Sequence, residues 1–196
     1  MRVSEIFYSL QGEGRWTGTP AIFVRLSGCN LSCDFCDTDH GRGREMTEVD
    51  IVKTVNEYSA RHVVITGGEP TLQLTASLVR QLHDSHKFVQ IETNGTCRLS
   101  DELLEEIDWI TCSPKYGKIP VIQRIDELKV VYDLDRVEDI ERLGEIFIAT
   151  GEYHLQPCDR KDAGYNEKNT ASCIKYILDN PKWTLSLQTH KILNIQ

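Results

Sequence analysis

Three cysteines, Cys29, Cys33 and Cys36, lie within eight residues of one another with the spacing C-x3-C-x2-C. Gly28 precedes them and polar residues separate them, which is the composition of a loop. Cysteine thiolates are the usual ligands of a 4Fe-4S cluster, which has four irons. A loop that wraps three thiolates around such a cluster would leave one iron able to bind a further ligand.

A closed zinc site is an alternative for the same loop. Adding His40 to the three cysteines gives a Cys3His set that could hold a structural zinc ion, and a disulfide is a third possibility. In a cytosolic chain, clustered cysteines are more often metal ligands than disulfides. The other cysteines are scattered, and we expect each to fill volume as a small hydrophobe: Cys97, Cys112, Cys158 and Cys173.

Other residues suited to binding a ligand lie within predicted strands or directly after them. Gly67 and Gly68 carry no side chains, so the backbone there could hydrogen-bond the ammonium or carboxylate of a ligand. Arg25 interrupts an apolar run, and because a buried charge needs a partner, a bound or a structural carboxylate should lie beside it. Glu69 follows the two glycines, and its carboxylate could be stabilised by the dipole at the start of the next helix. Glu92 could accept hydrogen bonds from a ribose or be a solvated strand end.

Composition limits the class of protein. The chain has 196 residues, of which 40% are hydrophobic and 27% charged, and we interpret it as one domain spanning 1–196. The formal charge of −8 argues against a nucleic-acid partner, although it allows a small anionic ligand. We find no long apolar run and no signal peptide. We therefore expect a cytoplasmic protein that binds neither nucleic acid nor membrane.

The elements predicted to position these residues are strands that alternate with helices. Apolar runs predict strands at 21–26, 62–66, 88–92, 109–112, 127–132 and 146–149. Residues 47–50 resemble a capping box that opens a helix, and further helices are expected at 72–86, 101–107, 136–143 and 169–178. This alternation predicts a parallel α/β sheet. About six strands are too few for a closed eight-stranded barrel, so we expect a partial, open (β/α)6-type barrel.

Polar segments follow several of these strands. They lie at 29–38, 66–69, 92–94 and 113–115. In parallel α/β folds, ligands bind at the carboxyl ends of the strands. Four polar segments at successive strand ends therefore predict one shared site.

The motifs taken together resemble the 7-carboxy-7-deazaguanine synthase family of radical S-adenosylmethionine (SAM) enzymes. The matching segments are SLQGEG at 9–14, FVRLSGCNL at 23–31, CDT at 36–38, TGGEP at 66–70, ETNGT at 92–96, SPK at 113–115 and LQTHK at 187–191. They cover nearly the whole chain, and the combination is far more specific than the cysteine spacing alone. The stretch from Gln123 to Gly164 contains no motif that we can place.

The resemblance implies a radical SAM barrel and a carbon–nitrogen lyase. Such an enzyme converts 6-carboxy-5,6,7,8-tetrahydropterin to 7-carboxy-7-deazaguanine, a step toward queuosine. A 5′-deoxyadenosyl radical made from SAM takes hydrogen from C6, the ring contracts, ammonia leaves and SAM is regenerated, with Mg²⁺ assisting. The resemblance also implies a pterin substrate, an electron donor such as flavodoxin or ferredoxin, and a homodimer.

The same resemblance implies roles for individual residues. The 4Fe-4S cluster would be held by Cys29, Cys33 and Cys36, and Mg²⁺ by Thr38, whose hydroxyl is a hard oxygen donor. The SAM contacts would be Phe35, Cys36, Asp37, Gly68, Glu69, Ser113, Pro114, Lys115 and Gln156, with Glu92 on the ribose. The substrate contacts would be Leu10, Gln11, Gly12, Glu13, Arg25 on the substrate carboxylate, Thr66, His190 and Gln196 through its main-chain carboxylate.

Two alternatives remain at this point. A glycyl-radical-enzyme activating protein shares the cysteine loop and a similar size, but it would act on a protein and would not need Arg25, Thr38 and His190 together. A zinc-stapled binding module would be no enzyme and would use the three cysteines with His40. The colour of anaerobically purified protein separates the metals, because an iron–sulfur protein is brown and a zinc protein is colourless.

Overall fold

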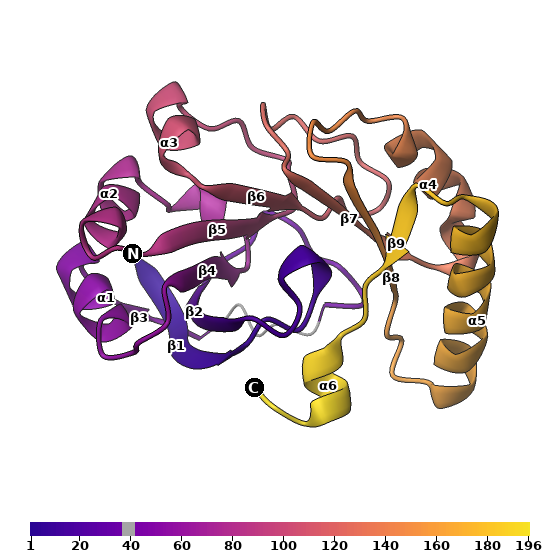
Figure 1. The fold of residues 1–196 in the computed structure, drawn as a ribbon, viewed down its shortest axis with the longest axis horizontal. Helices are drawn as coiled ribbons and strands as arrows, with labels where there is room; N and C mark the ends of the chain where they lie inside the picture. Colours follow the sequence, from indigo (N-terminus) through magenta and orange to yellow (C-terminus); the bar gives the residue numbers. More distant parts are fainter. Residues whose placement is uncertain (37–41) are drawn as a thin grey trace.

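A computed structural model describes residues 1–36 and 42–196 of the chain. Within these residues, one sheet has the strand order β3-β1-β2-β4-β5-β6-β7-β8-β9 (Figure 1). The strands are β1 Arg2–Leu10, β2 Pro20–Leu26, β3 Arg44–Glu45, β4 His62–Gly67, β5 Phe88–Thr93, β6 Trp109–Cys112, β7 Glu127–Tyr132, β8 Glu152–Pro157 and β9 Trp183–Leu185. The helices are α1 Glu48–Val55, α2 Ala76–Asp84, α3 Asp101–Glu106, α4 Val137–Gly144, α5 Ala163–Asp179 and α6 Thr189–Leu193, with short 3-10 turns η1 Gly14–Trp16, η2 Pro70–Leu72 and η3 Leu134–Arg136.

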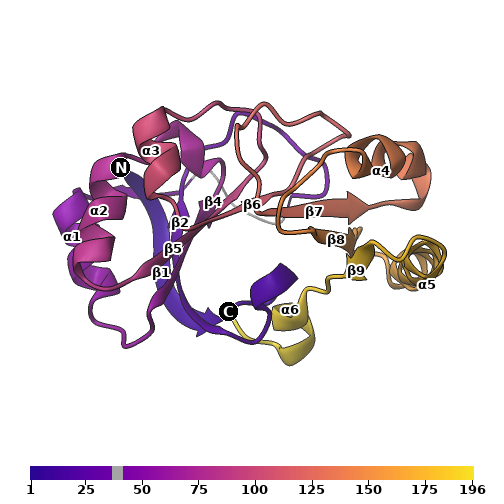
Figure 2. The same ribbon diagram turned by 45° about the horizontal axis from the view of Figure 1, so that its top comes forward.

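The predicted open parallel sheet is confirmed. Strands β2 and β4 through β9 pair in parallel, while β1 runs antiparallel to β2 and carries the short antiparallel β3 on its outer edge. The described strand order does not close on itself. Figure 2 shows the sheet as an open arc with α1 to α5 on its outer side, while η1 and α6 lie at the opening.

Local sequence explains most of these elements. Strand β4 is buried on both faces, and Val63, Val64 and Ile65 are wholly inaccessible, which accounts for its unbroken apolar run. Burial of each such side chain stabilises the fold by about 1.5–3 kcal/mol. The predicted capping box is present, because Thr47 caps α1 and bonds reciprocally with Asp50.

Several strand assignments required the tertiary structure, and β3, β8 and β9 were not predicted. The predicted strand at 146–149 is wrong, because this segment is a loop whose Ile148 is buried in the core beneath α4 and α5, and the strand follows later as β8. The apolar pattern there reflects packing and not strand pairing. Strand β1 was not predicted, since its polar residues, such as Glu5, interrupt the apolar alternation.

The core lies between the sheet and the outer helices in two main clusters. One packs α1, α2 and α3 against β2, β4, β5 and β6, and the other packs α4 and α5 against β7, β8 and β9. In the described parts of the chain, none of the helices combines the length and apolar character that a bilayer crossing requires.

Candidate functional site

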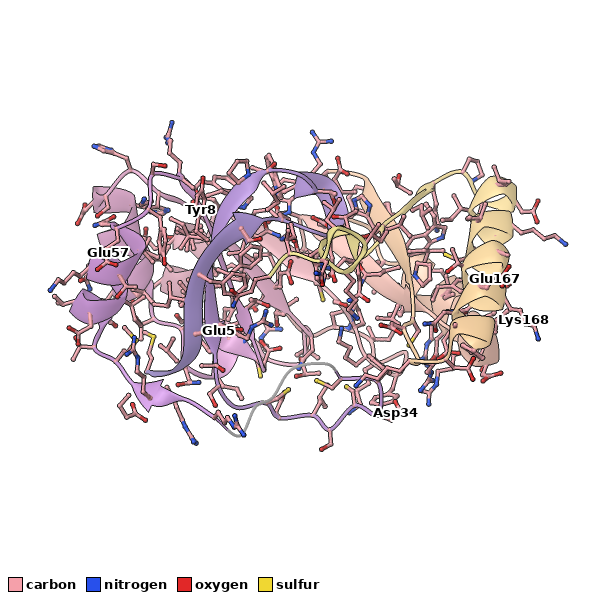
Figure 3. All side chains as sticks on the ribbon, turned by 90° about the horizontal axis from the view of Figure 1, so that it is seen from below. Glu5, Tyr8, Asp34, Glu57, Glu167 and Lys168 are labelled. Atoms are coloured by element: carbon pink, nitrogen blue, oxygen red, sulfur yellow. The ribbon has the colours of Figure 1, made fainter. Side chains whose placement is uncertain are left out.

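A single cavity of about 700 Å³ joins most of the predicted site residues. Every predicted substrate contact lines it: Leu10, Gln11, Gly12, Glu13, Arg25, Thr66, His190 and Gln196. The three loop cysteines line it as well, together with the predicted SAM contacts Phe35, Gly68, Glu92, Ser113, Lys115 and Gln156. Figure 3 views the molecule from below and labels Glu5 on β1, which lines the cavity, and Asp34 on the cysteine loop. The predictions for Asp37 and Thr38 lie outside the described residues.

The cysteine loop is placed by contacts at its start. Asn30 donates from Nδ2 to Thr96 Oγ1 at 2.8 Å and accepts from Asn94 Nδ2 at 3.0 Å, which ties the loop to the end of β5. Burial raises the pKa of the Cys33 thiol, and the nearby charge of Lys115 opposes this shift. A metal that binds such a thiol must displace its proton.

The Gly67-Gly68 turn fits closely against the residues before the cysteines. A Cβ on Gly68 would lie 1.8 Å from the carbonyl oxygen of Gly28, and Gly67 has a φ of +122°. The amide of Gly68 donates to Leu26 O at 3.0 Å, and that of Glu69 to Gly28 O at 2.9 Å. Only glycine allows this approach, so the turn fixes the start of the cysteine loop beside the cavity.

The donor set fits an iron–sulfur cluster better than a single ion. Among the described residues, no three His, Cys, Asp or Glu side chains gather around a point where one metal ion could be held. A structural zinc ion needs four ligands converging on itself, and His40 lies outside the described residues. A 4Fe-4S cluster can take one thiolate on each of its four irons, so three thiolates would bind three separate irons and need not converge on one ion. Three cysteines spread along one loop at one cavity suit that requirement.

Two predicted SAM contacts do not line the cavity. Glu69 is wholly buried and accepts hydrogen bonds from Thr71 N at 3.1 Å, Thr93 Oγ1 at 2.7 Å and Asn94 N at 2.7 Å. Its carboxylate therefore links the turn after β4 to the end of β5. Pro114 is buried beside the lining residues Ser113 and Lys115. The contacts of Glu69 and Pro114 with SAM stay predictions.

Lys129, in the middle of β7, is a lining residue that the sequence reasoning missed. It is 4% exposed, and its Nζ lies 2.5 Å from Glu13 Oε2 and 3.6 Å from Glu92 Oε1. Burial opposes the charge on Lys129, but Glu13, Glu92 and Glu127 together raise its pKa. A lysine inside the apolar run of a buried strand was the available signal, the same signal that singled out Arg25.

Glu13 is ionised because of this cation. Burial alone would raise its pKa, but the charge of Lys129 and hydrogen bonds from Lys129 and Gln188 lower it to about 2. Gln188 Nε2 donates to Glu13 Oε1 at 3.0 Å. Gln11 Nε2 donates to Glu92 Oε1 at 3.0 Å. The cavity therefore contains two carboxylates whose positions are fixed by amides and by one shared ammonium.

Arg25 has a structural carboxylate beside it. Its Nε donates to Glu5 Oε1 at 2.8 Å, and Nε2 of Gln196 donates to Glu5 Oε2 at 2.8 Å. Glu5 thus joins β2 to the end of the chain, and all three residues line the cavity. Glu5 was not predicted, although its place in a strand that runs antiparallel to β2 puts it opposite Arg25 in register.

The C-terminal segment covers the loop that contains Gln11, Gly12 and Glu13. The amide and hydroxyl of Thr189 both donate to Gly12 O, at 3.0 and 2.9 Å. A Cβ on Gly12 would lie 2.3 Å from Nδ1 of His190, so the glycine makes room for the imidazole. Ser186 accepts from Gly14 N at 2.9 Å and donates to Gln156 Oε1 at 3.0 Å, which anchors the same loop to β8.

The sequence and the fold of the chain are similar to those of known proteins. The family model described as the Radical SAM superfamily matches residues 23–118. The chain is 47% identical to the 7-carboxy-7-deazaguanine synthase of Bacteroides thetaiotaomicron, covering 100% of this chain and 98% of that protein. It is 39% identical to the protein of the same name from Bradyrhizobium diazoefficiens, with 99% and 98% covered. The crystal structure of QueE from Escherichia coli is similar with a TM-score of 0.73 and 32% identity, covering 95% of this chain and 92% of that one.

Proposed function

The chain belongs to the 7-carboxy-7-deazaguanine synthase family of radical SAM enzymes, and from that premise we propose how its cavity holds the reactants. The family's reaction converts 6-carboxy-5,6,7,8-tetrahydropterin to 7-carboxy-7-deazaguanine with loss of ammonia, so the chain is a carbon–nitrogen lyase. It uses a 4Fe-4S cluster, SAM and Mg²⁺. One observation supports the site: the loop cysteines and all the predicted substrate contacts line the same cavity.

We propose that the cofactors occupy the end of the cavity beside the cysteine loop. Cys29, Cys33 and Cys36 would hold the cluster, which together with SAM supplies the radical that removes hydrogen from the substrate. SAM would lie against the turn at Gly68 and the segment 113–115. The closely packed glycine turn leaves backbone groups as the binding surface there. The further SAM contacts that we propose are Phe35, Cys36, Asp37, Glu69, Glu92 and Gln156.

The substrate would occupy the opposite end, beneath the C-terminal segment. Glu13 is an ionised carboxylate at this end, and a pterin presents adjacent ring and amino N–H groups that a carboxylate can accept together. Arg25 would bind the substrate carboxylate with N–H groups other than the Nε that Glu5 occupies. The other proposed contacts are Leu10, Gln11, Gly12, Thr66, His190 and the main-chain carboxylate of Gln196, all of them lining residues.

The protein ligand of Mg²⁺ stays the predicted Thr38, which lies outside the described residues. Mg²⁺ keeps several waters and takes few protein oxygens, so a single hydroxyl together with the substrate carboxylate is a suitable set.

The family implies a small-molecule substrate and an external reductant. We propose in addition that the reductant is a flavodoxin or a ferredoxin, that the protein is a homodimer and that it works in the cytoplasm. Among the described residues, no cysteine forms a disulfide, as cluster assembly requires of its ligands. We further propose that residues 1–196 form one domain.

The test is an anaerobic reaction with the reconstituted protein, SAM, dithionite and the carboxylated tetrahydropterin. We expect the deazapurine to appear by mass spectrometry, and we expect the Cys33→Ala variant to cleave no SAM. Cluster-loaded protein that cleaves SAM but makes no deazapurine, and instead places a radical on a partner polypeptide, would support the glycyl-radical alternative. Colourless protein with one bound zinc would support the binding module.

A further inference from the structure

Arg160, just after β8, connects the cysteine loop to the end of β7. Its Nη1 donates to Asp34 Oδ2 at 2.8 Å, and its Nε donates to Asp133 Oδ2 at 3.1 Å, with a second bond from Nη2 to the same carboxylate. Asp133 is 3% exposed and also accepts from the hydroxyl of Tyr165 at 2.6 Å. The guanidinium is therefore fixed by Asp133 on the strand side and reaches outward to Asp34 on the loop.

Tyr116, after β6, contacts the same part of the loop from a second direction. Its hydroxyl accepts from the amide of Asp34 at 2.8 Å and lies 3.3 Å from the carbonyl oxygen of Ser32. Tyr116 has a φ of +53°, which is unusual for an aromatic residue and indicates that its position is imposed by its surroundings. Arg136 lies over its ring, with Cζ 4.8 Å from the centroid.

Phe35 lies between these two side chains. Its ring centroid is 5.8 Å from that of Tyr116, and Cζ of Arg160 is 5.8 Å from the Phe35 centroid. Phe35 lines the cavity and immediately precedes the third cysteine of the loop. From Cys29 to Cys36 the chain is neither helix nor strand, so its position depends on contacts from outside.

We propose that Arg160 and Tyr116 are positioning residues that hold the Asp34-Phe35 segment, and through it the cluster thiolates and the Phe35 ring, in the geometry that binds SAM. The inference rests on the family's cofactors and not on the identity of the pterin. It gives a role to part of the 123–164 stretch, which the sequence motifs left unexplained. Partners that orient the ligands of a metal site commonly affect its properties almost as strongly as the ligands do.

The exposure of the contacts distinguishes a role in positioning the loop from a role in the folding stability of the domain. The side chain of Asp34 is 58% exposed, and exposed ion pairs contribute little to folding stability. Loss of the Asp34 contact should therefore alter the loop without unfolding the domain. The Asp133 end of Arg160 is buried, so replacing Arg160 itself could lower stability as well.

The experiment measures SAM binding to anaerobically reconstituted protein in the absence of pterin, so its outcome does not depend on the proposed substrate. The variants are Arg160→Met, Asp34→Asn and Tyr116→Phe, the last of which keeps the ring and removes the hydroxyl. Arg80→Met is the matched control, because Arg80 pairs with two carboxylates, Glu102 and Glu106, away from the cavity.

We expect Arg160→Met to weaken SAM binding by roughly 10- to 100-fold, with Asp34→Asn and Tyr116→Phe changing it in the same direction. The electron paramagnetic resonance spectrum of the reduced cluster should change less on SAM addition than in the native protein. Arg160→Lys should recover part of the affinity, since it keeps the charge without the two-point fork. Arg80→Met should match the native protein.

Two results would overturn the proposal. One is native SAM affinity and an unchanged resonance spectrum in Arg160→Met. The other is a lowered melting temperature in Arg160→Met combined with native SAM affinity in both Asp34→Asn and Tyr116→Phe, which would limit Arg160 to supporting the β7 and β8 ends. Iron and sulfide content, measured for every variant, ensures that only cluster-loaded protein is compared.

Discussion

The Nζ of Lys129 lies 2.5 Å from Oε2 of Glu13, so a buried cation in the middle of β7 fixes a carboxylate that belongs to the loop after β1. The same Nζ is 3.6 Å from Glu92, which ends on the proposed SAM side of the cavity. One ammonium therefore links the two halves of the site. If this ammonium is removed, Glu13 and Glu92 both lose a positively charged neighbour.

Replacement of Lys129 by methionine should leave Glu13 buried without its cation. Breaking a buried pair from one side typically costs about 3–5 kcal/mol, and we expect a loss of that order in the free energy of unfolding by urea. The exposed Lys53→Met variant is the control and should change stability by less than about 0.5 kcal/mol. Equal unfolding free energies for the two variants would contradict the assigned pair.

Glu13 should make acid unfolding steeper. Its pKa in the folded protein is about 2, below its ordinary value of 4.5, so the unfolded chain binds its proton more readily. The stability that Glu13 contributes is therefore present above about pH 4.5 and is lost as the pH falls toward 2. Unfolding free energies measured across this window should fall less steeply in Glu13→Gln than in the native protein. An unchanged slope would mean that Glu13 does not titrate in this way.

Glu5→Gln should weaken substrate binding selectively. The carboxylate accepts from both Arg25 and Gln196, and the neutral amide would hold these two cavity-lining side chains less firmly. We expect KM for the pterin to rise by roughly tenfold or more, while iron content and SAM affinity stay native. Glu57→Gln is the control, because Glu57 is exposed on the helix side of the molecule (Figure 3). A loss of iron in Glu5→Gln would instead point to a role at the cluster.

Gly12→Ala should displace His190. The added Cβ would meet Nδ1 of the imidazole at 2.3 Å, so the ring or the whole of α6 must move. We expect weaker pterin binding in calorimetric titrations and little change in SAM binding. Gly164→Ala is the matched control, since its Cβ would have an ordinary 3.5 Å neighbour near the start of α5. Native pterin affinity in Gly12→Ala would show that the imidazole does not need its position beside Gly12.

Local patterns were sufficient to predict the cysteine loop, the glycine turn and the parallel sheet. The proposed cluster ligands lie within eight residues, so their spacing alone brings them to one loop. The apolar run at Val63–Ile65 follows from burial on both faces of β4. Because parallel strands present their carboxyl ends at one edge, the polar segments that follow them were expected to meet. For the same reason Arg25 and Thr66, paired in register on neighbouring strands, share the cavity.

Only the tertiary structure decided which of the polar side chains pair with one another. Lys129 and Glu13 are 116 residues apart, Arg160 and Asp34 are 126 apart, and Gln196 and Glu5 are 191 apart. No helical or strand periodicity extends over such separations, because it reflects only the local geometry of the backbone. The partners are fixed by the order and register of the strands and by the path of the C-terminal segment. The sequence by itself therefore determined the chemistry of the site, and the folded sheet determined how its charges are held.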